Sequence, residues 1–209
     1  GASSVQTLAF SVAFVACSNS GWPDVVIING HVYGEISRVD HSQSYLQSAQ
    51  LFRNMQNGTF TDISADAGAD FTRKIVGRGM AVGDYDGDGR EDLLVVNEEG
   101  APLLLHNDDR SGNHWLTIRC LRTKNGADAI GARITLRAGG HLCVSEVKAG
   151  GSYLSSDAPQ VHFGAGKASV ADLLEVRWPG GKVDRWQHVT LDRSISIWPG
   201  ATLAGSRKG

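Results

Sequence analysis

The sequence predicts an all-β protein in which about two β-propeller-type repeats, an incomplete propeller, precede a β-sandwich. Three observations support this fold class. One segment near the start aligns without gaps with a later segment, short apolar runs alternate with Gly, Asn and Pro turn signals, and the second half lacks a sustained helical period. With 209 residues and 22.3 kDa, the chain suits one large or two small domains, and we expect two.

The internal repeat defines the first domain. The segment SVAFVACSNSGWPDVVIING aligns with GMAVGDYDGDGREDLLVVNE, pairing Gly21 with Gly89 and Asp24 with Asp92. In each copy an apolar run, a polar loop and a second apolar run follow one another. β-Branched residues and Leu in the runs, with Gly and Asp in the loop, are typical of two strands joined within a sheet. Such repeats fit propeller blades, and two blades cannot close a ring.

Three other segments complete these blades. LFRNMQNGTFTDIS predicts two strands that meet at Asn57-Gly58, a dipeptide suited to the positive φ angles of a tight turn. Residues 34–50, rich in Ser and Gln, predict a long exposed insertion with room for one helical turn. Pro102 to His106 predicts a further strand after the second copy.

From about residue 113 the sequence changes to longer strands with a turn about every ten residues, which is the spacing of a β-sandwich. Gly139-Gly140 and Gly180-Gly181 mark two of its hairpins. We place the boundary near residues 108–112, so that the domains comprise residues 1–110 and 111–209.

Composition excludes several classes of protein. The formal net charge is -2 and no basic stripe interleaves with aromatic residues, so we expect no nucleic-acid partner. The apolar stretch from Leu8 to Cys17 is too short to span a bilayer and has no preceding Lys or Arg, which argues against a signal peptide and a transmembrane segment. Cys17, Cys120 and Cys143 allow at most one disulfide; buried free thiols fit better, and the redox compartment stays open.

One loop carries a metal-ligand pattern. Asp84, Asp86, Asp88 and Asp92 occupy positions 1, 3, 5 and 9 of the loop, and the carbonyl of Arg90 is available at position 7. Oxygen ligands in this order can surround a Ca²⁺ ion at about 2.3–2.6 Å. Four carboxylates this close would repel one another without a cation. We therefore predict a structural calcium site, with magnesium disfavoured by its demand for octahedral geometry.

Two comparisons refine this prediction. The loop is not an EF-hand, because position 12 is Val95 and strands are expected on both sides. A solvated acidic turn is the alternative interpretation, since Asp and Gly are common in turns. In the first copy of the repeat, Ala16, Ser18 and Ser20 replace three of the carboxylates, so we expect that loop to hold no metal. Elsewhere no catalytic pattern emerges: HxH and HExxH spacings and a nucleophile elbow are absent from the sequence.

These motifs resemble known families. GDYDGDGREDLLVVN is similar to an FG-GAP or VCBS-type calcium repeat, and GGSYLSS, HFGAG and VRWPGG together resemble the C-terminal portion of the ASPIC/UnbV family, which includes cartilage acidic proteins. The resemblance implies further propeller blades upstream of a β-sandwich ASPIC/UnbV domain, and Ca²⁺ as a structural ion held at the motif positions Asp84, Asp86, Asp88 and Asp92. It also implies an extracellular or periplasmic location.

The first functional hypothesis is a calcium-stabilised, extracellular-type interaction or scaffold module without catalytic activity of its own and with a protein or glycan partner. The alternative is an enzyme or enzyme domain of enediyne-type natural-product biosynthesis, with a cyclase-like role that the family resemblance implies. Its pocket would lie between blades and sandwich, near Trp115, Tyr153 or Trp178.

A second alternative is a carbohydrate-binding module. Exposed rings of Trp22, Trp186 or Trp198 would then form a solvent-facing platform.

Overall fold

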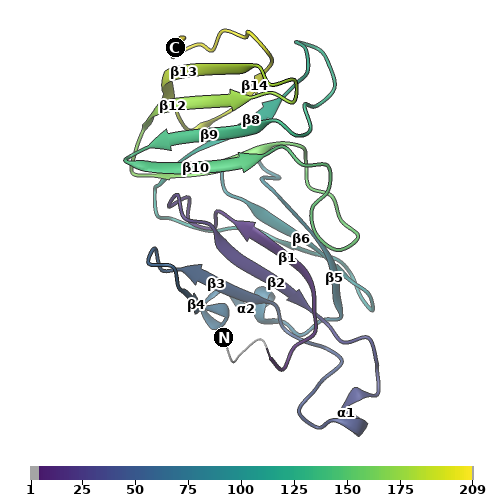
Figure 1. Ribbon diagram of the computed structural model, residues 1–209. Coiled ribbons are helices and arrows are strands. Elements are labelled where there is room, and N and C mark those ends of the chain that lie inside the picture. Colours follow the sequence, from purple (N-terminus) through teal and green to yellow (C-terminus); the bar gives the residue numbers. More distant parts are fainter. Residues whose placement is uncertain (1–4, 209) are drawn as a thin grey trace.

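The computed structural model describes residues 5–208, and in it the internal repeat folds as two equivalent strand pairs (Figure 1). β1 (Ala9–Val15) pairs with β2 (Asp24–Asn29), and β5 (Gly77–Gly83) pairs with β6 (Asp92–Asn97), both antiparallel. Val12 lies opposite Ile27, and at the equivalent positions of the second copy Met80 lies opposite Val95. The two copies therefore share one register, which confirms the repeat.

Each strand pair is the start of a small antiparallel sheet. β3 (Gln50–Asn54) and β4 (Phe60–Asp62) extend the first pair into the order β1-β2-β3-β4, and β7 (Leu103–Leu105) extends the second into β5-β6-β7. The predicted strand at Pro102 to His106 and the turn at Asn57-Gly58 are thus confirmed, although the connection between β3 and β4 is longer than a two-residue turn. Short helical segments lie between the sheets' strands: α1 (Ile36–Val39), η2 (Ser64–Asp66) and α2 (Ala69–Thr72).

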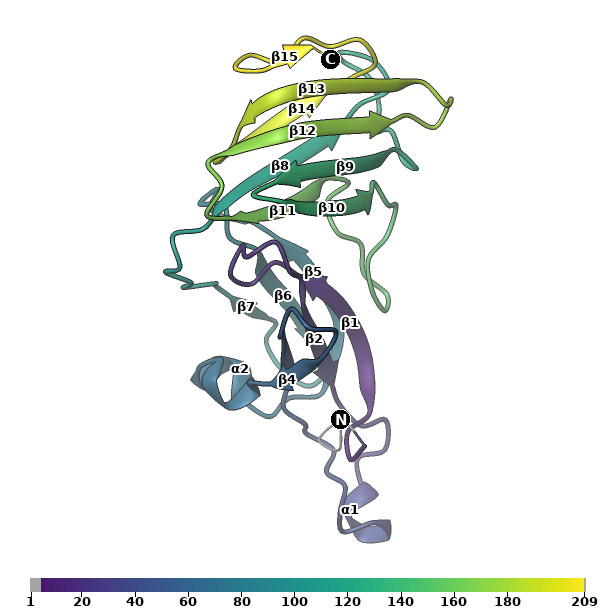
Figure 2. The ribbon, with the colours of Figure 1, turned by 60° about the vertical axis from the view of Figure 1, so that its left-hand side comes forward.

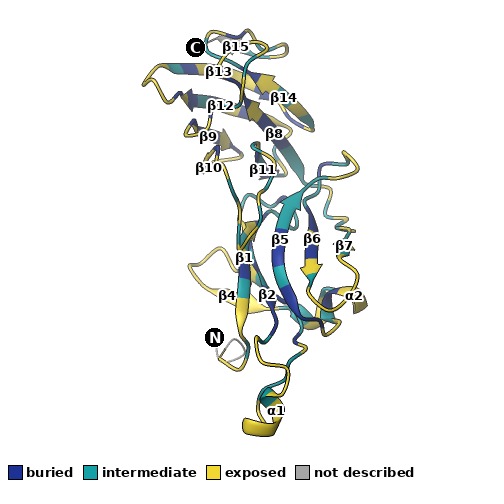
Figure 3. Cartoon of the chain, turned by 90° about the vertical axis from the view of Figure 1, so that its right-hand side faces the viewer, coloured by how far each residue is buried: buried dark blue, intermediate teal, exposed yellow. Residues whose placement is uncertain are grey.

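Residues from both small sheets share one apolar core. Its buried members are Val15, Val26, Ile28, Ala49, Phe71, Ile75, Met80, Leu93 and Val95. The insertion that carries α1 extends away from this core and is largely exposed, as predicted, whereas the middle of β2 and β5 is buried (Figure 3). The outer face of β1 stays open to solvent: Phe14 is 69 % exposed.

The second half forms a sandwich of two sheets (Figure 2). One sheet has the order β10-β9-β12-β13-β15 and the other has the order β11-β8-β14, in which β14 and β8 run parallel. The strands are β8 (His114–Cys120), β9 (Arg133–Ala138), β10 (His141–Glu146), β11 (Val161–Gly166), β12 (Val170–Arg177), β13 (Val183–Thr190), β14 (Arg193–Ile197) and β15 (Arg207–Lys208). Both predicted glycine hairpins are present, joining β9 to β10 and β12 to β13.

The sandwich has a core of its own, because alternate residues of facing strands point inward. Ile134 and Leu136 of β9 meet Leu116 and Ile118 of β8 there, and all four are fully or almost fully buried. The all-β architecture and the succession of blades and sandwich are therefore confirmed. The three cysteines are free thiols, as expected. The domain boundary near residues 108–112 stays a prediction.

The sandwich rests on one end of the blade sheets (Figure 1). At this end lie the β1–β2 loop and the β5–β6 loop, and the long loop between β10 and β11 reaches down from the sandwich (Figure 1). That loop contacts both blade edges: Ser152 Oγ accepts the Val12 N–H at 2.8 Å, and Asp157 Oδ1 accepts the Val82 N–H at 2.8 Å. The predicted metal loop thus lies at the junction of the two halves.

Candidate metal centre

The β5–β6 loop holds its shape through two left-handed glycines. The strand pair closes at Gly83 opposite Asp92, and the chain between them must reverse within a few residues. Gly87 and Gly89 have φ angles of 80° and 85°, a region that costs little only for glycine. This geometry is why the motif alternates Asp with Gly.

Backbone N–H groups of the loop donate hydrogen bonds to its carboxylates and hold them in position. Asp84 accepts the N–H of Gly87 at 2.8 Å and of Asp88 at 3.1 Å through Oδ1, and of Gly89 at 2.8 Å through Oδ2. Asp86 Oδ1 accepts the Asp88 N–H at 3.3 Å. The loop therefore folds around the carboxylate of Asp84, which is position 1 of the predicted ligand pattern.

Asp92 closes the loop from the first position of β6 and is 2 % exposed. Its Oδ2 accepts the Tyr85 N–H at 3.2 Å and its Oδ1 accepts the Asn107 N–H at 2.8 Å. His106 Nδ1 lies 3.1 Å from the same Oδ1. A buried carboxylate with these partners is held firmly in place.

The carboxylates converge as two overlapping groups. Within residues 5–208, ligand atoms of Asp84, Asp86 and Asp88 lie within 4.8 Å of one another, and so do those of Asp86, Asp92 and His106. Asp86 belongs to both groups. The structure thus brings the four predicted carboxylates to one place, but in two groups joined by Asp86.

Two further residues, Arg90 and His106, lie at this centre, and the sequence predicted a ligand role only for Arg90. The guanidinium of Arg90 forms an ion pair with Asp88, and its Nε donates to the Asn107 carbonyl at 2.6 Å. The role of the Arg90 carbonyl as a ligand stays a prediction. His106 was not predicted, because it follows Asp92 by 14 residues; only the pairing of Leu93 with Leu105 places it beside that carboxylate.

The donor set fits a hard divalent cation. Carboxylate oxygens dominate it, and one arginine offsets only part of the negative charge of four aspartates. Oxygen-rich sites of this kind favour Ca²⁺ or Mg²⁺ over softer metals. His106 is the one nitrogen donor that could join the second group.

The β1–β2 loop keeps the backbone of a metal loop without its carboxylates. Asn19 and Gly21 have φ angles of 51° and 87°, at the positions equivalent to Gly87 and Gly89. Asp24, the counterpart of Asp92, accepts the Asn54 N–H at 2.8 Å. Arg53 precedes Asn54 as His106 precedes Asn107. The first copy therefore has an arginine, which is always positively charged, at the position where the second copy has a histidine that can be neutral and bind a metal.

Asn19 connects the metal loop to the sandwich. Its side-chain amide donates to the Gly89 carbonyl at 2.8 Å, and its Oδ1 accepts from His162 Nε2 at 2.7 Å. The Thr117 hydroxyl lies 2.8 Å from His162 Nδ1, so the neutral ring is bonded at both nitrogens. Trp115 stacks on the His162 ring at 5.8 Å between centroids and 17° between planes.

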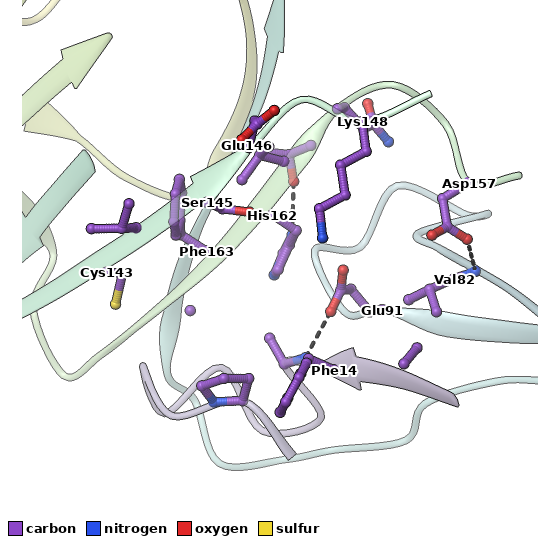
Figure 4. A pocket seen from close by; sticks show the side chains of 18 of the residues that line it. Phe14, Val82, Glu91, Cys143, Ser145, Glu146, Lys148, Asp157, His162 and Phe163 are labelled. Atoms are coloured by element: carbon purple, nitrogen blue, oxygen red, sulfur yellow. Dashed lines mark hydrogen bonds between the residues drawn. The ribbon is translucent and has the colours of Figure 1, made fainter. Parts of the chain in front are cut away.

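A cleft of about 1050 Å³ opens between blades and sandwich next to this centre (Figure 4). Glu91 lies in it, and its Oε2 accepts the Ala16 N–H at 2.7 Å. Burial raises the pKa of Glu91 to about 7, and the nearby carboxylates of Asp157 and Asp84 add to the rise. Lys148 extends its amino group into the space above Glu91 (Figure 4).

Among the aromatic residues named for the two alternative functions, Trp115 packs on the metal loop at Gly89 and Trp22 lines the cleft. Trp178 is buried in the sandwich core, and its Nε1 donates to Asp184 at 2.8 Å. Tyr153 packs edge-on against Phe10. Trp186 is 1 % exposed, so the expectation of a solvent-facing ring at this position is wrong: it fills the sandwich core, where the volume of a tryptophan is needed. Trp198 packs against the same core.

Two models of known protein families match different parts of the chain. An FG-GAP-like repeat model matches residues 18–95, and a model described as ASPIC and UnbV matches residues 122–204. The chain thus contains an FG-GAP-like repeat followed by an ASPIC/UnbV region.

Particular relatives are similar over half of the chain. Cartilage acidic protein 1 of Xenopus tropicalis is 41 % identical over 113 residues, which cover 51 % of this chain and 17 % of that protein. The Homo sapiens protein of the same name is 38 % identical over 113 residues, covering 51 % of this chain and 16 % of its own length. The chain therefore matches about a sixth of the length of these relatives. No helix among residues 5–208 has the length and apolar character needed to cross a membrane.

Proposed function

We propose that the chain is a calcium-stabilised interaction or scaffold module, in which the β5–β6 loop binds one Ca²⁺ and the ion locks the blades to the sandwich. The observation that carries this proposal is the position of the carboxylate groups at the junction. Gly89 of the loop packs so closely on Trp115 of β8 that an added Cβ would lie 1.9 Å from the ring. A cation that orders the loop would therefore order the junction as well.

Several features support a structural rather than catalytic ion. Each of the four carboxylates accepts a hydrogen bond from a backbone N–H group of the loop, and Arg90 forms an ion pair with Asp88. FG-GAP-like repeats typically bind calcium, and residues 18–95 match such a repeat. We further propose an extracellular or periplasmic location, in keeping with the resemblance to cartilage acidic proteins, and two units that divide near residue 110.

Thermal melting tests the proposal. A ligand that binds only the folded state stabilises it by about 2.7 kcal/mol at a hundredfold excess over its dissociation constant. We expect Ca²⁺ to raise the melting temperature of chelator-treated protein, and Mg²⁺ to raise it much less. The double substitution Asp86→Asn and Asp88→Asn should remove the response to Ca²⁺.

Asp172→Asn is the matched control, because Asp172 is an exposed aspartate on β12, remote from the loop. This variant should respond to Ca²⁺ like the unmodified protein. An unchanged melting temperature on adding Ca²⁺ to the chelated protein would refute the proposal, and an equal response to Mg²⁺ would refute the choice of ion.

A further inference from the structure

The cleft runs along the free edge of β10. Among residues 5–208, this strand is the outermost member of its sheet and pairs with β9 alone. Cys143 faces the sandwich core, whereas Leu142 and Val144 point to the opposite face, with exposed fractions of 59 % and 45 %. Side chains of both faces nevertheless line the same cleft. A strand can contribute both faces to one cleft only by presenting its edge to it.

Backbone hydrogen-bonding groups of β10 point into this cleft. The two-residue turn Gly139-Gly140 places Ala138 opposite His141, and such a turn makes these flanking residues a hydrogen-bonded pair. Bonded and non-bonded pairs then alternate along the ladder. The N–H and C=O groups of Leu142, Val144 and Glu146 are therefore directed away from β9, toward the cleft.

The opposite wall of the cleft is β1, whose edge is partly capped by side chains. The Val12 and Ala16 N–H groups donate to Ser152 and Glu91, so both point away from β2. Phe14 lies between them and directs its N–H the same way, where it finds no hydrogen-bond partner among residues 5–208. Its ring forms an apolar wall of the cleft (Figure 4).

Charge in the cleft is unbalanced. Its acidic lining residues are Asp84, Glu91, Glu146 and Asp157, and its basic ones are Arg133 and Lys148. Because Asp84 belongs to the proposed Ca²⁺ site, only the other three carboxylates are counted, and against two cations they leave an excess of one negative charge when all are ionised. Glu91 belongs to the β5–β6 loop, and Asp157 accepts the N–H of Val82 just before that loop, so both lie at the end of the cleft near the metal loop. An occupant with a basic group at that end would complement them.

We propose that the cleft binds an extended peptide, which adds to β10 as a new edge strand of the five-stranded sheet. The peptide has apolar residues at alternate positions, which pack on Phe14 and Val144, and a Lys or Arg near Glu91. Strand addition explains why the cleft offers a row of free backbone groups beside apolar side chains. This inference deepens the interaction role proposed above and rests on it, but it does not depend on the metal.

A displayed library of random peptides tests the proposal. Peptides of about eight residues span a strand the length of β10. The library is selected on the unmodified chain, once with Ca²⁺ and once with chelator, and is counter-selected on Val144→Pro. Proline removes the N–H of Val144, which the β9 ladder does not use, and edge strands tolerate such a residue. Val144→Thr is the matched control that keeps the N–H.

Enriched peptides should alternate apolar residues and carry a basic residue. Their affinity should fall about tenfold for Val144→Pro and change little for Val144→Thr. N-Methylation of the peptide backbone should abolish binding at every second position only, and this measurement stands even when Val144→Pro fails to fold. Glu91→Gln, which can still accept the Ala16 N–H, should weaken binding about threefold, because one attracting charge is lost.

Three results of the peptide experiments would overturn the proposal. These are a selection that enriches no peptide, an N-methylation effect that is equal at all positions, and unchanged affinity for Val144→Pro. Self-association in sedimentation experiments that Val144→Pro abolishes would assign the edge to a second copy of the chain and would also overturn it. Peptide binding that persists while Ca²⁺ fails to change the melting temperature would refute the metal proposal alone.

Discussion

Gly89 is a residue of the metal loop that packs directly against the sandwich. Its φ angle is 85°, and a Cβ there would lie 1.9 Å from Trp115 Cε2. The ring cannot easily move aside, because it stacks on His162. We expect Gly89→Ala to lower the free energy of unfolding by about 3 kcal/mol, combining the strain of the left-handed backbone with overpacking. Urea unfolding measures the loss.

Gly87 provides the control for that substitution. It has a similar φ angle of 80°, but a Cβ there would meet no atom within 4 Å. Gly87→Ala should therefore cost only the backbone strain, about 1 kcal/mol. Equal losses for the two variants would show that contact with Trp115 contributes nothing to stability.

His162 makes stability depend on pH. Burial lowers its pKa from 6.5 to about 4. The unfolded chain takes up a proton as the pH falls below 6.5, whereas the folded protein does not until about pH 4. Stability from this residue is thus fully present above pH 6.5 and declines between pH 6.5 and 4, by about 2–3 kcal/mol.

The substitution His162→Gln isolates this effect from the titration of carboxylates. Glutamine keeps a donor and an acceptor for Asn19 and Thr117 but does not titrate. We expect its unfolding free energy to fall less than that of the unmodified protein between pH 6.5 and 4, as followed by urea unfolding at several pH values. Parallel profiles for the two proteins would contradict the assignment of His162 as the buried neutral group.

At the scale of elements, the two strand–loop–strand copies show what sequence can predict. Their apolar runs and their Gly and Asp positions predicted the strands, the shared register and the four clustered carboxylates. The same pattern could not predict His106 or the β10 edge cleft. Both arise from strand pairing between distant segments, such as Leu93 with Leu105, and single-sequence periodicity carries no information about that pairing.

The loop between β10 and β11 is the second element of the junction. It supplies the Asp157 carboxylate to the Val82 N–H at the edge of β5. A hydrogen bond to a charged group contributes about 1.5–3 kcal/mol when its partner would otherwise be left unsatisfied. We expect Asp157→Ala to destabilise the protein by about 2 kcal/mol and to increase proteolytic cleavage within residues 148–159.

Asp172→Ala is the corresponding control, because an exposed surface substitution should stay within about 0.5 kcal/mol. Comparable stability and cleavage in both variants would mean that the loop does not depend on Asp157 for its attachment.

For the whole molecule, the structure changes how the aromatic residues are interpreted. Sequence alone could not separate Trp residues of a binding surface from those of a core, because both are apolar and occur in strands. Trp186 proves to be core, and Trp115 proves to be part of the junction. The blades and the sandwich are therefore joined by specific contacts: Asn19 is hydrogen-bonded to His162, and Trp115 stacks on the His162 ring. We propose that metal binding at the β5–β6 loop stabilises this interface.

Calorimetric titration of the chelator-treated chain with Ca²⁺ tests that central claim most directly. We expect one Ca²⁺ per chain for the unmodified protein and for Asp172→Asn, and no binding by the protein carrying both Asp86→Asn and Asp88→Asn. Absence of binding to the unmodified chain, or equal binding by the double variant, would contradict it.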